Sequence, residues 1–69
     1  MDNKNPPFKP NDRIRLTHMG KDPHPIKPGT VGTVESAHWF QNNWQVYVRW
    51  DNGRSLGLVM PPDKAVLLK

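Results

Sequence analysis

The chain has 69 residues, a length that makes one small domain and argues against a large enclosed active site in a monomer. It contains no cysteine, which excludes disulfides and thiolate metal ligands and makes the cytoplasm the expected compartment. Lysine and arginine outnumber aspartate and glutamate by ten to six, so nucleic acid or an acidic protein surface is the first partner to consider, although such a charge also serves solubility alone.

Residues 1–11 are polar and rich in proline, which predicts a flexible N-terminal arm. Phe8 is the large apolar side chain of this arm, and we expect it to pack the arm onto the domain formed by residues 12–69. The arm lacks the apolar run of a signal peptide, and no apolar stretch of the sequence is long enough to span a membrane.

Residues 12–19 alternate between apolar and polar side chains. Ile14 and Leu16 share one parity, whereas Arg13 and Arg15 share the other. Because side chains of a strand point alternately to its two faces, this pattern predicts a first strand with a buried face and a solvated, basic face.

Residues 20–29 contain three prolines and two glycines, which predicts a long, stiffened loop anchored by Ile26. Extended structure resumes over residues 31–39. The two valines of this stretch lie on opposite parities, so a regular strand cannot bury both, and we expect Gly32 to form a bulge or sharp bend.

Residues 44–58 predict a β-hairpin, entered through a turn at residues 40–43. Two tryptophans and two valines alternate along its first strand and form the expected core face. A two-residue loop would send the leucines of the second strand to the opposite face. A type I turn followed by Gly53 in a left-handed bulge instead pairs Val48 with Leu56 on the core face.

A turn rich in proline at residues 60–63 leads to a fifth strand at residues 65–68, and no stretch shows helical periodicity. Short strands, a long loop after the first and a prolyl turn before the last predict an all-β fold, a small five-stranded SH3-like barrel. An OB-fold is disfavoured because it usually needs a longer chain with a helix.

Four segments carry a recognisable pattern: R-[IV]-x-L-x-x-M at residues 13–19, Asp-Pro at residues 22–23, P-G-T-x-G-T-V at residues 28–34 and W-D-N-G-x-S-L-x-L at residues 50–58. This pattern resembles a family of small SH3-like domains of bacteria, phages and mobile elements, filed as a domain of unknown function. The resemblance implies the barrel and supplies no activity. The hairpin segment AHWFQNNW is more aromatic than the family's turn, and Ala65 stands where an aromatic residue is common.

Residues 9–16 and 28–37 are also similar to the KOW-type motif of ribosomal and transcription-factor domains. That similarity implies an SH3-like fold that contacts RNA, DNA or polymerase. A topological similarity to type II dihydrofolate reductases, whose small protomers form a tetramer around a shared pore, would imply an enzyme. The V-Q-I-Y signature of those reductases is replaced by SLGL at residues 55–58, which argues against the activity.

The sequence shows no catalytic constellation. His18, His24 and His38 have no paired spacing that predicts a metal site, and the acidic residues are scattered singly, without an acid–base pair. The glycines at residues 29–32 lack the strand, loop and helix context of a phosphate-binding loop. We therefore expect no catalytic residues, no metal and no cofactor.

Basic and aromatic residues are interleaved instead. Guanidinium groups pair with phosphates, and aromatic rings stack on bases or proline. Trp50 is assigned to the core, and at least one other aromatic residue should be exposed because so small a core cannot hold them all. The candidate binding residues are Arg13, Arg15, Lys21, Lys27, Trp39, Phe40, Trp44, Tyr47, Arg49 and Arg54.

The sequence therefore predicts a small non-enzymatic binding module, a monomer or weak homo-oligomer. We expect it to contact nucleic acid, or a nucleic-acid-associated complex, through basic and aromatic surface residues. The alternative is a protein-interaction module that binds an acidic or extended protein segment through the proline-rich loop and the hairpin tip. A tetrameric enzyme of the type II dihydrofolate-reductase kind is a more distant alternative, and no membrane partner is expected.

Overall fold

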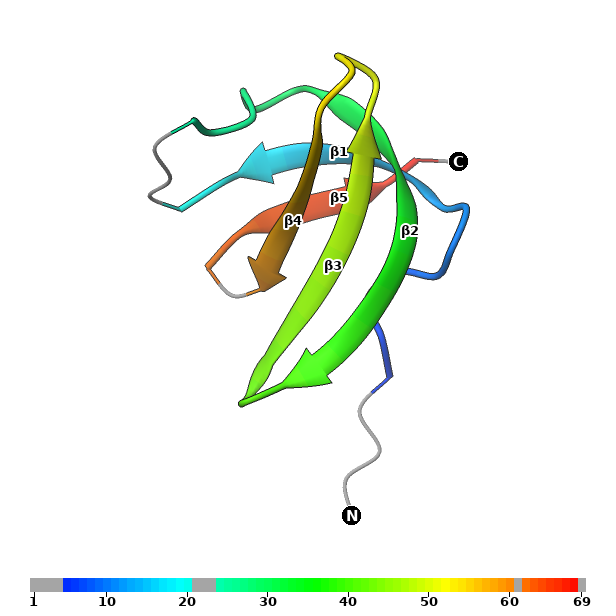
Figure 1. Cartoon of the computed structure of the whole chain (residues 1–69), viewed down its shortest axis with the longest axis vertical. Helices are drawn as coiled ribbons and strands as arrows, with labels where there is room; N and C mark the ends of the chain where they lie inside the picture. Colours follow the sequence, from blue (N-terminus) through cyan, green and yellow to red (C-terminus); the bar gives the residue numbers. More distant parts are fainter. Residues whose placement is uncertain (1–4, 21–23, 61, 69) are drawn as a thin grey trace.

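The computed structural model describes residues 5–20, 24–60 and 62–68. These residues form one five-stranded antiparallel sheet without a helix, so the all-β prediction is confirmed. No helix among them is long and apolar enough to cross a lipid bilayer. The strands are β1 (Arg13–His18), β2 (Val31–Phe40), β3 (Asn43–Trp50), β4 (Ser55–Met60) and β5 (Lys64–Leu67), arranged in the order β4-β3-β2-β1-β5 (Figure 1).

The predicted closure of the sheet into a barrel is not found. β4 and β5 are the two edge strands, and no ladder joins them within the described residues. The buried carboxylate of Asp63 bridges part of this opening, because it accepts hydrogen bonds from the backbone N–H of Val59 in β4 at 2.9 Å and of Gly20 after β1 at 2.6 Å. Asp63 directly precedes β5, which pairs with β1. The Asp63 side chain therefore links β4 to the end of β1, where no backbone ladder of the described residues joins them.

The hairpin of β3 and β4 has the predicted loop and register. The Gly53 N–H donates to the Trp50 carbonyl at 3.0 Å, and the Trp50 N–H donates to the Arg54 carbonyl at 2.8 Å. Gly53 adopts a φ of 92°, and Val48 pairs with Leu56. This geometry is that of a type I turn followed by a left-handed glycine bulge, and it brings the apolar residues of both strands to one face.

Gly32 does not form the predicted bulge. It lies in regular register opposite Trp50, and the register of β2 shifts beside Glu35 instead. A Cβ atom at Gly32 would lie 2.7 Å from Cγ1 of Val48 and 2.8 Å from Cε3 of Trp50. Glycine is therefore required at this position by the close packing of core side chains against the backbone, whereas the change of face along β2 is made at Glu35.

The hairpin of β2 and β3 is longer than predicted and ends in a two-residue turn. Gln41 and Asn42 have φ values of 51° and 69°, and Phe40 pairs with Asn43. Two left-handed residues in succession are typical of a type I′ turn, which matches the twist of the flanking strands. In Figure 1 the tip of this hairpin projects away from β1 and β5.

The core lies on one face of the sheet, which we call the inner face. Trp50 is 1% exposed, as predicted, and its indole N–H donates to the Leu56 carbonyl at 3.0 Å. Ile26 anchors the proline-rich loop and Phe8 anchors the segment before β1, as the sequence also predicted. The buried apolar residues are Phe8, Ile14, Leu16, Ile26, Val34, Val46, Val48, Trp50 and Leu58.

The segment that precedes β1 contacts the sheet beyond Phe8. The Asn11 N–H donates to the Val34 carbonyl at 2.7 Å, and the Lys9 N–H donates to the Asp12 carboxylate at 2.8 Å. Residues 1–4 of the predicted arm lie outside the described residues, and the flexibility of the arm stays a prediction.

Candidate nucleic-acid interface

The sheet face opposite the core, which we call the outer face, carries polar, basic and aromatic side chains. Its residues alternate along each strand with those of the inner face. The shift of register beside Glu35 determines which residues of β2 belong to it, because the same parity is inward before the shift and outward after it. The outer face includes Arg13, Arg15, Thr33, Ser36, His38, Phe40, Gln45, Tyr47, Arg49, Lys64 and Val66.

Tyr47 is the central aromatic residue of the outer face and is 46% exposed. Its ring leans over Gly57 of β4, where an added Cβ atom would lie 3.3 Å from Cδ1 of the ring. The ring of His38 meets it edge-on, with centroids 5.8 Å apart and an interplanar angle of 60°. The Tyr47 ring is thus supported by the backbone of β4 on one side and by a neighbouring ring, while nearly half of the residue faces solvent.

A shallow hollow of about 240 Å³ opens beside the Tyr47 ring. Glu35, Ser55 and Gly57 contribute to its walls. Phe40 extends the aromatic surface toward the hairpin tip and is 55% exposed. The outer face therefore combines two exposed rings with a hollow between neighbouring strands.

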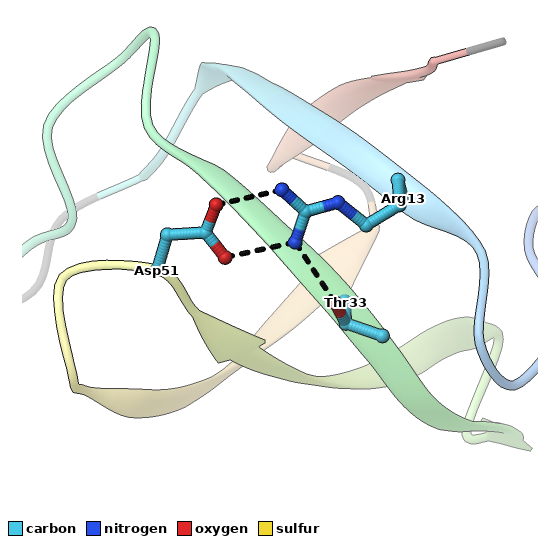
Figure 2. A network of polar contacts seen from close by, with 3 residues as sticks. All are labelled: Arg13, Thr33 and Asp51. Carbon is cyan, nitrogen blue, oxygen red and sulfur yellow. Dashed lines mark hydrogen bonds and ion pairs between the residues drawn. The ribbon is translucent and has the colours of Figure 1, made fainter.

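Arg13 is held in a fixed position across the sheet (Figure 2). Its Nη1 and Nη2 atoms donate to the two carboxylate oxygens of Asp51 at 2.8 and 2.7 Å, and Nη1 also donates to Oγ1 of Thr33 at 3.0 Å. The hydrogen bonds from this guanidinium hold the pKa of Asp51 below its ordinary value; desolvation opposes this effect, and the charge of Arg13 lowers the pKa further by a smaller amount. Arg13 thus connects β1 to the turn after β3, and its charge is matched by a carboxylate.

Arg49 is less constrained than Arg13. Its Nε atom lies 3.7 Å from Oε2 of Glu35, beyond hydrogen-bonding distance, and its side chain is 67% exposed. Such a loose, solvated pair contributes little to stability and leaves the guanidinium able to bind an anion.

Positive charge is left over on the outer face. Within the described residues, Arg15 of β1 and Lys64 of β5 form no ion pair, and both are exposed. His18 pairs in register with Lys64 and is also exposed. The carboxylates that the described strands and turns place near this face, Glu35 and Asp51, are each already close to an arginine. The outer face is therefore net basic.

The predicted binding residues do not form one cluster. Trp39 and Trp44 lie on the inner-face side of the hairpin tip, where their rings pack edge to face with centroids 5.4 Å apart at 63°. Lys27 is exposed in the proline-rich loop, Arg54 is half-buried in the turn after β3, and Lys21 lies outside the described residues. Five of the predicted residues share the outer face: Arg13, Arg15, Tyr47 and Arg49, with Phe40 farther away at the hairpin tip.

Sequence reasoning missed His38 and Lys64 as members of this surface. The parity of His38 could be assigned only once the bulge was placed at Glu35, and the position of Lys64 depended on the register of β5 against β1. No group of three or more histidine, cysteine, aspartate or glutamate side chains in the described part of the chain could hold a metal ion.

The fold defines a small all-β domain built on one open antiparallel sheet. The chain belongs to the family described as a domain of unknown function (DUF4314), whose model matches residues 4–68. No curated protein and no solved structure shows significant similarity to it. The resemblance to KOW-type domains therefore stays an expectation from the sequence, and the role of the outer face has to be argued from its own geometry.

Proposed function

We propose that this domain is a non-enzymatic nucleic-acid-binding module of the cytoplasm, and that its outer face contacts the ligand. One observation carries the proposal: the exposed rings of Tyr47 and Phe40 share a single sheet face with arginines whose charge exceeds that of the neighbouring carboxylates. Stacking rings and phosphate-binding cations on one surface are the two elements that proteins use to bind nucleic acid without a deep groove.

The distribution of charge supports a phosphate ligand. Arg15 and Lys64 have no carboxylate partner within the described strands, and Arg49 is held only loosely. Each cation that neutralises a phosphate releases a condensed counterion, so binding should weaken as salt rises. With Arg15, Arg49 and Lys64 as the contacting cations, the slope of log K against log salt for a single strand should be about −2.

Fluorescence anisotropy with labelled oligonucleotides tests the proposal. We expect binding at low salt that weakens about tenfold or more between about 50 and 200 mM salt. The variant Arg15→Gln should bind more weakly, whereas Arg54→Gln should not, because Arg54 lies opposite Trp50 on the inner-face side of the hairpin. Absence of binding at low salt, to single-stranded and duplex oligonucleotides alike, would refute the proposal.

A protein-interaction module is the second candidate, and the hairpin tip favours it. Trp39 is 42% exposed and packs edge to face on Trp44, which leaves an aromatic surface on the side of the tip that faces away from Phe40. A hollow of about 450 Å³ beside the proline-rich loop, lined mainly by apolar residues, offers a second place for an extended peptide. This function predicts a salt-tolerant complex that is lost in Trp39→Ser.

The tetrameric reductase alternative requires a different oligomeric state. A pore shared by four protomers requires a tetramer, which light scattering detects directly. A tetramer that also binds NADPH would favour the enzyme, whereas a monomer that binds oligonucleotides would favour the proposed module.

A further inference from the structure

We infer that the outer face accepts single-stranded rather than double-stranded nucleic acid, with one base stacked on Tyr47 and another on Phe40. This inference rests on the proposed function and specifies its ligand. Three features of the outer face carry it: the way the Tyr47 ring is supported, the spacing of the aromatic rings along the strands, and the position of the cations relative to the rings.

The Tyr47 ring is presented as a platform. The ring leans over Gly57 so closely that a Cβ atom added there would lie 3.3 Å from Cδ1 of the ring. The hollow of about 240 Å³ lies beside the Tyr47 ring. A base can occupy that hollow and stack on the Tyr47 ring only when the face of the base is not already covered by a neighbouring base. In a duplex each base is already stacked and paired, so the platform gains nothing from a duplex beyond phosphate contacts.

The spacing of the rings also favours a stretched single strand. Tyr47 lies opposite Ser36, and Phe40 lies four residues farther along β2, so the two positions are separated by about 13 Å along the strand. Successive bases of B-form DNA are only about 3.4 Å apart on each strand. His38 occupies the same face between the two positions. An extended strand can therefore place successive bases along the row formed by Tyr47, His38 and Phe40.

The cations lie at one end of the row of rings. Arg49 follows Tyr47 by two residues on the same face, on the side away from Phe40, and its side chain is 67% exposed. Arg15 lies on β1 opposite Val31 of β2, beyond Arg49 at the same end of the row. The rings thus form one line along β2 and β3, and the unmatched positive charge lies beyond the Tyr47 end of this line. A single strand laid along the row can therefore continue past Tyr47 and bring its phosphates to these cations.

The experiment compares one unstructured single strand with one duplex. A labelled oligothymidylate of about a dozen nucleotides and a duplex of the same length are titrated with the wild-type domain at low salt by fluorescence anisotropy. We expect the single strand to bind at least about tenfold more tightly. Tyr47→Ala should weaken single-strand binding about tenfold, the effect of losing one stacked base, and change duplex binding less than about twofold.

Further variants separate the ring from other effects. Tyr47→Phe keeps the ring and should retain single-strand affinity. Phe40→Ser should weaken it by about three- to tenfold, and this position at the exposed tip makes little demand on folding. Trp39→Ala, which removes an exposed ring from the inner-face side of the same hairpin, serves as the matched control and should leave affinity unchanged.

The outcomes distinguish this inference from the proposed function. If the duplex binds as tightly as the single strand, and the substitutions of Tyr47 and Phe40 change neither affinity, the inference is wrong while the proposed function stands. Loss of single-strand binding in Trp39→Ala equal to that in Tyr47→Ala would also overturn it. If neither oligonucleotide binds, the inference and the proposed function both fail.

Discussion

The inner and outer faces of the sheet are built from alternate residues of the same strands. In β3, Val48 and Trp50 are 1% exposed, whereas Tyr47, their neighbour on the outer face, is 46% exposed. The buried core of the inner face is apolar, whereas the outer face carries arginines, a histidine and exposed rings. The side chains that stabilise the fold and those that we propose to bind the ligand are therefore only one residue apart. Neighbouring substitutions should therefore affect one property and spare the other.

The largest expected effect is the loss of stability in Leu58→Ala. Leu58 is completely buried on the inner face, so its truncation leaves a cavity and should lower the free energy of unfolding by about 3 kcal/mol. Val59, the next residue, is 41% exposed, and Val59→Ala should cost less than about 1 kcal/mol. Urea unfolding followed by tryptophan fluorescence measures both. Equal losses in the two variants would contradict the division between the faces.

Asp63→Ala tests the open side of the sheet, where no ladder joins the edge strands β4 and β5 within the described residues. Removal of the carboxylate leaves the N–H groups of Val59 and Gly20 without their acceptor, which should cost about 2–3 kcal/mol. Asp63→Asn keeps one acceptor oxygen and should lose less. Amide hydrogen exchange at Val59 should accelerate in both variants, and unchanged exchange would show that the carboxylate does not hold β4 in place.

Gly32→Ala and Gly57→Ala test a glycine on each face of the sheet, because Gly32 lies opposite Trp50 on the inner face and Gly57 lies opposite Tyr47 on the outer face. A Cβ atom at Gly32 would overlap Val48 and Trp50, so Gly32→Ala should destabilise the domain by about 2 kcal/mol. The Cβ atom at Gly57 would instead press on the Tyr47 ring at 3.3 Å. We expect Gly57→Ala to weaken single-strand binding, and to lower the free energy of unfolding less than Gly32→Ala does. Thermal unfolding and anisotropy on the same samples decide the point, and the reverse pattern would contradict the roles of the two glycines.

Much of the inner face could be predicted from the sequence because strand parity and turn geometry specify it locally. The alternation of Ile14 and Leu16 in the first strand, and the glycine bulge at Gly53, led to the observed core residues and hairpin register. Parity fails where the chain adds a residue. The bulge was expected at Gly32 but lies at Glu35, because the glycine is required by packing from other strands that the local sequence does not reveal.

The outer face was predictable only in part for the same reason. Arg13 and Arg15 follow directly from the parity of β1, and Tyr47 and Arg49 from that of β3. The ion pair of Arg13 with Asp51 joins residues far apart in the sequence and could not be inferred locally. The open edge between β4 and β5 was also missed, since whether a sheet closes depends on the pairing of its ends rather than on any single strand.

Arg15→Gln should alter the outer face without altering the inner one. Loss of one phosphate contact should make the slope of log K against log salt shallower by about 0.7 for a single strand. Because Arg15 is exposed and has no ion pair within the described residues, its free energy of unfolding should change by less than about 0.5 kcal/mol. An unchanged slope would exclude Arg15 from the interface.

The smallest expected effect is that of Asp51→Asn on acid stability. The pKa of Asp51 is lowered in the folded state by the hydrogen bonds from Arg13, so its contribution to stability is present above its ordinary pKa of about 3.9. That contribution is lost as the pH falls through the lower, folded-state pKa. The wild type should therefore be slightly more stable than Asp51→Asn at pH 7 and approach it below about pH 4. A difference independent of pH would contradict this assignment.

The central claim is that the outer face, and not the inner-face side of the tip, is where nucleic acid binds. Side-chain aromatic NMR signals followed during titration with a short single-stranded oligonucleotide test it most directly. The ring signals of Tyr47, His38 and Phe40 should shift together, while the indole N–H of Trp50, which is bonded to Leu56, should not. Shifts confined to the indoles of Trp39 and Trp44, or no shifts at low salt, would contradict the claim.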